Sequence, residues 1–200
     1  MNEIEIETPR GPARVRISEP DGKPASFLAM GHGAGGGIDA PDLTAVHDAA
    51  LAAGVTVALV TQPYRVAGRR APAPGSQLDE AWTAVIEHIR VRNLPLIVGG
   101  RSSGARVACR TAADLGAAGV LALAFPLHPP GKPDRTRADE LPTAVPTLVM
   151  NGDRDPFGVP SPTADVEVIV RPGATHDLRK DLKTTADLAV TWLRTHAWTH

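Results

Sequence analysis

The amino-acid sequence predicts an α/β fold, with a mostly parallel sheet that opens on an antiparallel hairpin and carries helices on both faces. Period-2 alternation fills the first 18 residues, and from residue 26 onward short apolar runs alternate with segments of helical period. The composition, 42% hydrophobic and 22% charged over 200 residues, is that of an ordinary globular protein and excludes a disordered chain. We expect one domain over residues 1–200, because no change in composition marks a boundary.

The first two strands are expected to pair at an edge of the sheet. Ile4 and Ile6 alternate with glutamates, Val15 and Ile17 alternate with arginines, and the turn-rich segment 8–13 separates them. Antiparallel pairing places the glutamates of one strand opposite the arginines of the other, which is mildly favourable.

The later elements alternate between strand and helix. Strands are expected at 26–30, 55–60, 94–100, 120–125, 146–152 and 166–170. Helices are expected from about Pro41 to Gly54, from a capping box of Ser76 and Asp79, over 103–115 and over 178–196. The longest loops, 61–76 and 126–144, are too short to fold as a cap domain.

Charge and cysteine content exclude several classes of function. The formal net charge of −1 gives no electrostatic footprint for nucleic acid. The single cysteine, Cys109, excludes an intramolecular disulfide and any CxxC site, and no spacing of His, Cys and carboxylates indicates a metal. The N-terminus is acidic without an apolar segment, and no run is long enough to span a membrane, so we expect a cytoplasmic protein.

The strongest chemical signal is the segment Gly100-Arg101-Ser102-Ser103-Gly104. It has the pattern G-x-S-x-G and lies between a predicted buried strand and a predicted helix. That setting is the one in which a sharp turn exposes a nucleophilic serine. The alternative is a glycine-rich connection without chemistry.

A nucleophilic serine needs a histidine base and a carboxylate that orients the base. In a strand-turn-helix elbow of this kind, the chain order is serine, acid, histidine. Asp153 and Asp155 follow the strand at 146–152, and His176 follows the strand at 166–170. The carboxyl ends of strands are where open α/β sheets keep their sites, so both carboxylates are candidates and His176 is the expected base.

The glycine-rich loop 31–37 allows two interpretations. It matches G-x-G-x-x-G, but a dinucleotide site needs an acid at the end of the next strand, where residues 60–62 carry none. The alternative is a loop that supplies an amide to an oxyanion hole. The serine elbow downstream favours the second interpretation.

These segments resemble those of a known family. The chain is similar to small α/β-hydrolases without a cap domain, of the dienelactone-hydrolase-like type. It is most similar to the family that includes the testis-expressed hydrolase-like protein and a related chromatin-complex subunit. The segments that carry the resemblance are 31–36, 99–108, 125–132 and 152–158. The resemblance implies an α/β-hydrolase fold and places the catalytic acid on Asp155. The chain departs from the family's usual elbow at Arg101, Ser103 and Ala105.

The resulting hypothesis is a serine hydrolase for an ester or related acyl bond of a small molecule, without a cofactor. Ser102 attacks, His176 transfers the proton, Asp155 orients His176, and the N–H groups of Ala34 and Ser103 stabilise the oxyanion. Because the family includes members thought to act as scaffolds, the alternative is a catalytically silent binding module.

Cations in the loops suggest substrate contacts. His32, Arg65, Arg101 and His128 are candidates for binding the substrate, and Arg69, Arg70 and Lys132 add positive charge nearby. Arginine holds carboxylates and phosphates at two points, so an anionic substrate is expected from this hypothesis. The alternative is that the loop arginines are solvated or paired with Asp79 and Glu80.

Overall fold

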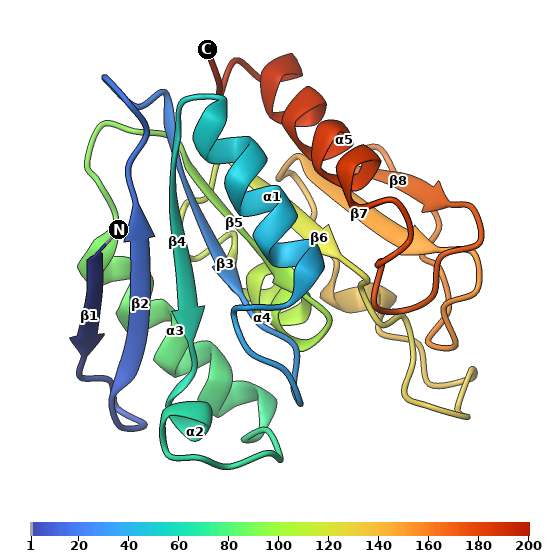
Figure 1. Ribbon diagram of the computed structural model, residues 1–200. Helices are drawn as coiled ribbons and strands as arrows, with labels where there is room; N and C mark the ends of the chain where they lie inside the picture. The colour runs from blue at the N-terminus through green and yellow to red at the C-terminus, as the bar shows by residue number, and fades with distance from the viewer. Residues whose placement is uncertain (1) are drawn as a thin grey trace.

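An eight-stranded sheet of order β1-β2-β4-β3-β5-β6-β7-β8 forms the centre of the computed structural model, which describes residues 2–200 (Figure 1). The strands are β1 (Asn2–Ile6), β2 (Ala13–Ser18), β3 (Ser26–Gly31), β4 (Val55–Thr61), β5 (Leu96–Arg101), β6 (Gly119–Leu123), β7 (Thr147–Gly152) and β8 (Val166–Arg171). Strands β3 to β8 are mutually parallel, and β2 pairs antiparallel with both β1 and β4. The predicted fold class is therefore confirmed.

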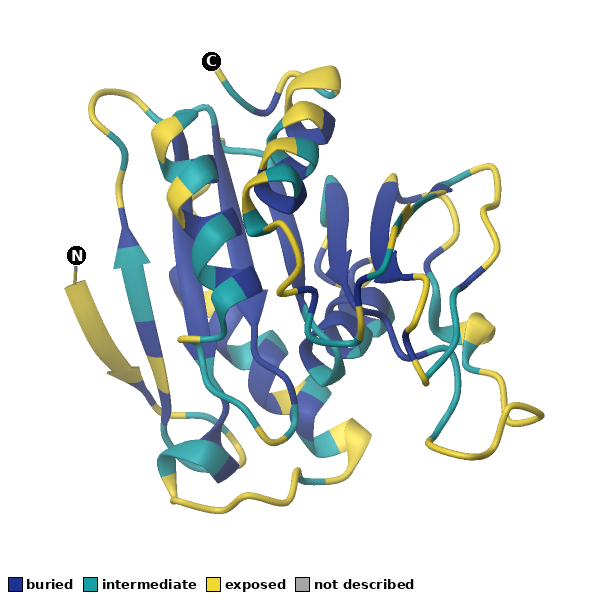
Figure 2. Cartoon of the chain, turned by 45° about the vertical axis from the view of Figure 1, so that its right-hand side comes forward, coloured by how far each residue is buried: buried dark blue, intermediate teal, exposed yellow. Residues whose placement is uncertain are grey.

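The N-terminal hairpin pairs in the expected register. Glu5 lies opposite Arg14 and Glu3 opposite Arg16, with Nε–Oε2 and Nη2–Oε2 distances of 3.2 and 3.7 Å. Both pairs are exposed, so each contributes well under about 1 kcal/mol to stability. Strand β1 is the exposed edge of the sheet (Figure 2), and its charged side chains make it a poor template for further strand pairing.

Helices cover both faces of the sheet. Helices α1 (Pro41–Ala52) and α5 (Leu182–Thr195) lie on the near face in Figure 1, and α3 (Gly75–Ile89) and α4 (Ser103–Thr111) lie on the far face. The sequence of β3 is apolar throughout because both faces of the strand are buried. Leu28 and Met30 pack into the core under α1 and α5, whereas Phe27 and Ala29 pack into the core under α3 and α4.

Several predicted boundaries need correction. The capping box is wrong: α3 begins at Gly75 after Pro74 without a side-chain cap. Asp79 binds Arg110 of α4 at two points instead, with Nη2–Oδ1 and Nε–Oδ2 distances of 2.6 and 2.8 Å. Two parallel hydrogen bonds between a guanidinium and a carboxylate are stronger than the single bond that the Asp79 carboxylate would accept from a backbone N–H.

The last helix begins later than predicted, at Leu182. Asp181 has left-handed backbone (φ 55°) and caps the helix by accepting from Thr184 N at 3.1 Å. The loop after β4 contains an unpredicted helical turn, α2 (Pro63–Val66), which Pro63 starts by fixing φ at the first position.

The connections that leave the carboxyl ends of the strands add no further domain. The connection between β6 and β7 contains only a 3₁₀ turn, η1 (Ala138–Glu140), and within residues 2–200 no connection forms a cap domain. No helix in that part of the chain combines the length and apolar character that a membrane crossing needs.

Candidate active site

Ser102 occupies a strained turn between β5 and α4. Its φ and ψ are 53° and −110°, a region that residues with a Cβ rarely adopt. The turn is held because Ser102 N donates to Leu123 O at 2.9 Å and Arg106 N donates to Ser102 O at 3.1 Å. The backbone therefore fixes where the hydroxyl stands before any substrate arrives.

The glycines of the motif allow β3 to approach the turn. A Cβ on Gly100 would lie 2.5 Å from the carbonyl oxygen of Gly31, and a Cβ on Gly104 would overlap the same oxygen. Only glycine fits at these two positions. The close contact brings the loop after β3 beside Ser102.

Three strand ends bring Ser102, His176 and Asp155 into one hydrogen-bonded chain. The Ser102 Oγ–His176 Nε2 distance is 2.9 Å, and the His176 Nδ1–Asp155 Oδ2 distance is 2.8 Å. The Asp155 side chain is fully buried, whereas 19% of the His176 side chain is exposed. Because a carboxylate only accepts, Nδ1 carries the imidazole proton and Nε2 is left to accept the proton of the serine hydroxyl.

The two candidate carboxylates have separate partners. Asp155 also accepts from Phe157 N at 2.9 Å, and the Phe157 ring lies 4.3 Å from the His176 ring. Asp153 instead accepts from Gly173 N at 2.7 Å and is exposed. Asp155 alone is therefore placed to orient His176, while Asp153 ties together the loops after β7 and β8.

The loop after β3 is held from its inner side. Gly33 lies against the elbow, since a Cβ built on it would be 3.6 Å from Ser102 Cβ. His32 Nδ1 donates to Gly33 O at 2.8 Å, and Tyr64 Oη donates to Ala34 O at 2.8 Å. In a trans peptide the N–H points opposite to the C=O, so the Gly33 carbonyl bound by His32 directs the Ala34 N–H away from the buried imidazole.

Besides the Ala34 N–H, the N–H of Ser103 is free of a helical acceptor, because Ser103 is the first residue of α4. Ser103 follows Ser102 directly in the chain. Ala34 and Ser103 thus lie on the two segments that meet beside Ser102, namely the loop after β3 and the start of α4.

His32 is structural, which corrects its expected contact with substrate. It is 2% exposed, and its Nε2 accepts from Gln62 N at 3.1 Å while its Nδ1 binds Gly33. Burial, with a smaller effect from Arg65, lowers the pKa of His32, which keeps the ring neutral and its Nε2 an acceptor.

Arg101 also points inward rather than toward a substrate. Its Nε donates to Asp42 Oδ2 at 2.8 Å, and its Nη2 donates to His176 O at 3.1 Å. Arg65 and His128 remain at the surface of the site loops. Arg65 Nη1 donates to Arg69 O at 3.2 Å, and His128 Nδ1 donates to Pro129 O at 3.0 Å.

A match to a family model covers most of the chain. The model described as Alpha/beta hydrolase domain matches residues 24–195. The chain belongs to the α/β-hydrolase family. No curated protein matches the sequence of this α/β-hydrolase.

Solved structures share the fold at low identity. An α/β serine hydrolase homologue from Coxiella burnetii is 23% identical with a TM-score of 0.79, covering 96% of this chain and 97% of its own. A lidless α/β serine hydrolase from Xanthomonas campestris is 21% identical with a TM-score of 0.79, covering 98% and 94%. Dienelactone hydrolase from Anabaena variabilis is 17% identical with a TM-score of 0.75, covering 97% and 96%. At these identities the likeness establishes the α/β-hydrolase fold.

Two buried polar residues of this α/β-hydrolase were not predicted from its sequence. Asn151 accepts from Phe125 N at 2.9 Å and donates to Gly158 O at 3.0 Å, so it joins the ends of β6 and β7. Asp42 is fully buried beside Arg101, and burial raises the pKa of its carboxyl although Arg101 opposes the shift. Asn151 could have been suspected as a polar residue ending an apolar strand, but Asp42 resembles an ordinary first-turn acid.

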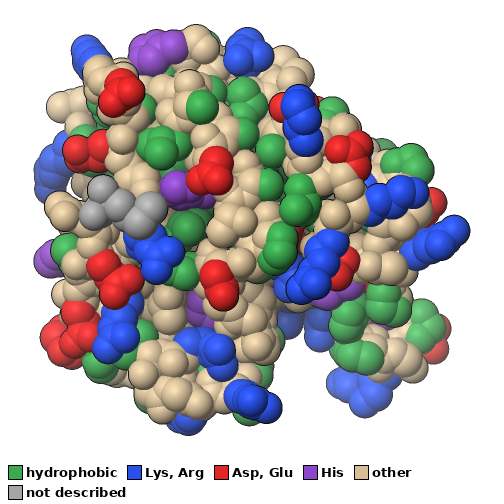
Figure 3. Space-filling view, viewed as in Figure 1, with side chains coloured by type: hydrophobic (Ala, Val, Ile, Leu, Met, Phe, Trp, Pro, Cys, Tyr) green, Lys and Arg blue, Asp and Glu red, His purple; other side chains and the backbone are tan. Residues whose placement is uncertain are grey.

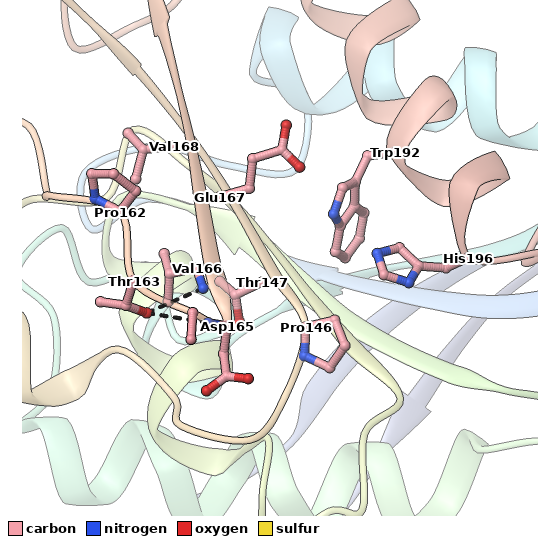
Figure 4. A pocket seen from close by; sticks show the side chains of 11 residues that line it. Pro146, Thr147, Pro162, Thr163, Asp165, Val166, Glu167, Val168, Trp192 and His196 are labelled. Carbon is pink, nitrogen blue, oxygen red and sulfur yellow. Dashed lines mark hydrogen bonds between the residues drawn. The ribbon is translucent and has the colours of Figure 1, made fainter.

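A hollow lies at the other end of the sheet from Ser102, where β7 and β8 have their amino ends. About 520 Å³ in volume, it is lined by residues where β7 and β8 begin, by Trp192 of α5 and by His196, which follows α5 (Figure 4). It contains no serine or cysteine, and strand amino ends are not where open α/β sheets keep their sites. Within residues 2–200, no cluster of three or more His, Cys, Asp and Glu side chains is arranged to hold a metal ion.

Proposed function

We propose that this α/β-hydrolase is a serine hydrolase that cleaves an ester or related acyl bond. The observation that carries the proposal is the hydrogen-bonded chain from Ser102 through His176 to the buried Asp155, set on a turn of positive φ. A hydroxyl, an imidazole of fixed tautomer and a carboxylate in this order are the parts of a nucleophilic acyl-transfer site.

The reaction has two steps. Ser102 Oγ attacks the acyl carbon while His176 Nε2 takes the hydroxyl proton, and the amides of Ala34 and Ser103 stabilise the oxyanion. The intermediate collapses as His176 returns the proton to the leaving group, which leaves Ser102 acylated. Water, deprotonated by His176, then attacks the acyl-enzyme and releases the acid. Asp155 stabilises the imidazolium in both steps.

The substrate is proposed to be a small acyl compound, as for a carboxylesterase. The surface is hollowed between the body of the molecule and the loop after β6, at the lower right of Figure 3, where no cap domain covers the strand ends. The similarity to the testis-expressed hydrolase-like family and a cytoplasmic location are also part of the proposal, and neither decides the bond that is cleaved.

An anionic group on the substrate is a further part of the proposal. Segment 62–75 carries three arginines and no acid. Asp79 and Glu80, which could have neutralised them, bind Arg110 and Arg10, and within residues 2–200 no ion pair involves Arg65, Arg69 or Arg70. Lys and Arg side chains lie on both sides of the hollow in Figure 3.

This part is tested by comparing neutral and carboxylate-bearing esters of equal size at low salt. We expect the wild type to have a higher kcat/KM for the anion, by about tenfold, and Arg65→Ala with Arg69→Ala and Arg70→Ala to remove the preference. An unchanged preference in the triple variant would exclude this segment as the anion site.

The catalytic proposal is tested by hydrolysis of p-nitrophenyl acetate. We expect measurable turnover by the wild type and a loss of roughly 10⁴-fold or more in Ser102→Ala at an unchanged melting temperature. If the folded wild type and the variant hydrolyse the ester equally, the chain is a silent member of its family.

A further inference from the structure

We propose that Arg101 is a positioning residue that, held by Asp42, fixes the histidine base relative to the nucleophile. The inference rests on the proposed serine-hydrolase function and adds a residue to it. Arg101 immediately precedes Ser102, yet its side chain turns away from the hydroxyl and toward the loop that carries His176.

The guanidinium joins three parts of the site. Its Nη2 donates to the main-chain oxygen of His176 at 3.1 Å, and its Nε donates to Asp42 Oδ2 at 2.8 Å. Its Nη1 lies against the loop after β3, since a Cβ built on Gly33 would be 3.0 Å from it. One planar group therefore contacts the loop that carries His176 (the base loop), the loop after β3 and helix α1.

Asp42 holds the guanidinium in place. Its side chain is fully buried, and its Oδ1 accepts from Leu43 N at 3.0 Å, so the carboxylate is fixed in the first turn of α1. A buried carboxylate is costly without a partner, and Arg101 is the cation that it contacts. The arginine cannot swing toward solvent without leaving that charge unpaired.

The loop that carries His176 borders open space on the side of the guanidinium. A hollow of about 240 Å³, lined in part by Asp42, Arg101, Asp177 and Arg179, lies beside the guanidinium. Within residues 2–200, the His176 carbonyl accepts a hydrogen bond from one donor, Arg101. Loss of this contact leaves space into which the loop can move, and a shift of about 1 Å between base and nucleophile lowers turnover severely.

The competing interpretation is that Arg101 binds the substrate. The two roles differ in their kinetic effect, because loss of a substrate contact raises KM, whereas a misplaced base lowers kcat at unchanged KM. They also differ in their effect on the free protein, since only a positioning residue restrains the His176 loop without substrate.

The experiment uses the double variant Arg101→Met/Asp42→Asn, which removes the pair without leaving a buried charge. We expect kcat for p-nitrophenyl acetate to fall roughly a hundredfold with KM within about twofold of the wild type. We expect a fluorophosphonate probe to label Ser102 more slowly by a similar factor, and amide hydrogen exchange over residues 173–180 to be faster. The single variant Arg101→Lys keeps the charge without the planar two-point geometry, so its kcat should lie between those of the wild type and the double variant.

The matched control is Arg110→Met/Asp79→Asn, which removes a second arginine–aspartate pair, one that lies half-buried between α3 and α4. Glu140, which also binds Arg110, keeps Arg106 as a partner. The control should lower the melting temperature but leave kcat and exchange over 173–180 unchanged.

The proposal is overturned if the Arg101 double variant matches the control in kcat and exchange, or if its main effect is a raised KM. Failure of the proposed function has a different signature, namely a wild type that neither hydrolyses the ester nor reacts with the probe. In that case, the exchange measurement on free protein still decides whether Arg101 restrains the His176 loop.

Discussion

The two ends of the sheet differ in what they hold. At the carboxyl ends of the strands, Ser102 stands in strained backbone and Asp155 is buried, and both side chains form a hydrogen bond with His176. At the amino ends lies the hollow of about 520 Å³, where the hydrogen bonds drawn in Figure 4 stay within residues 163–166. Volume therefore does not mark the site. The site is marked instead by the combination of strained backbone at Ser102 with a buried carboxylate that is hydrogen-bonded to a partly exposed histidine.

The largest effects are expected from the base and the acid. His176→Ala should lower kcat roughly 10⁴-fold or more, and Asp155→Asn should approach that loss because it disturbs the tautomer of the base. Asp153→Asn should change kcat by less than about fivefold, since the Asp153 side chain accepts from Gly173 N and has no hydrogen bond to His176. Steady-state kinetics on p-nitrophenyl acetate measures all three variants. An inactive Asp153→Asn beside an active Asp155→Asn would reverse the assignment of the acid.

A smaller effect is expected from the length of the acyl chain. The loop over 126–144 carries no helical cap, so a long acyl chain would extend over polar loops and gain little apolar burial. We expect kcat/KM for the acetate to exceed that for the dodecanoate by about fivefold or more. Comparable or faster hydrolysis of the dodecanoate would show that the site has an apolar channel and is not open.

A pH-dependent effect on stability is expected from His32. Its folded-state pKa lies below the unfolded value of about 6.5, so its contribution to stability is fully present above about pH 6.5 and is lost as the pH falls through the folded pKa. Asn in its place cannot titrate. The melting-temperature advantage of the wild type over His32→Asn should therefore shrink between about pH 8 and about pH 5. A constant difference would mean that His32 does not titrate with unfolding.

The smallest effect is expected at the amino ends of the strands. Glu167 and His196 line the 520 Å³ hollow. The variants Glu167→Gln and His196→Ala should leave kcat and KM within about twofold of the wild type. His196 stacks on Trp198 at 4.5 Å, so its variant should lose some thermal stability. A loss of turnover comparable to that of His176→Ala would remove the distinction between the two ends.

The sequence predicted the parts of the site that depend on local pattern. The strand-turn-helix setting of Ser102 is a local pattern, and the order of Ser102, the acid and His176 can be read directly along the sequence. The fold that contains them is confirmed. The choice between Asp153 and Asp155 came from the family resemblance, because both follow the same strand end.

The inward turn of Arg101 could not be predicted in the same way. Its partner Asp42 lies 59 residues earlier in the chain and is buried only because α1 packs there. The capping box failed for a related reason, since Asp79 found a stronger partner on another helix. Local patterns state which groups are available, and tertiary contacts decide which of them pair.

The most direct test of the central claim is covalent labelling by a fluorophosphonate, followed by intact-mass measurement and peptide mapping. The probe reacts only with a serine whose proton is removed by a placed base. We predict one adduct per chain, on Ser102, and none in Ser102→Ala or in His176→Ala at the same exposure. A folded wild type that takes up no probe, or that takes it up at another residue, would contradict the assignment of Ser102 as the nucleophile.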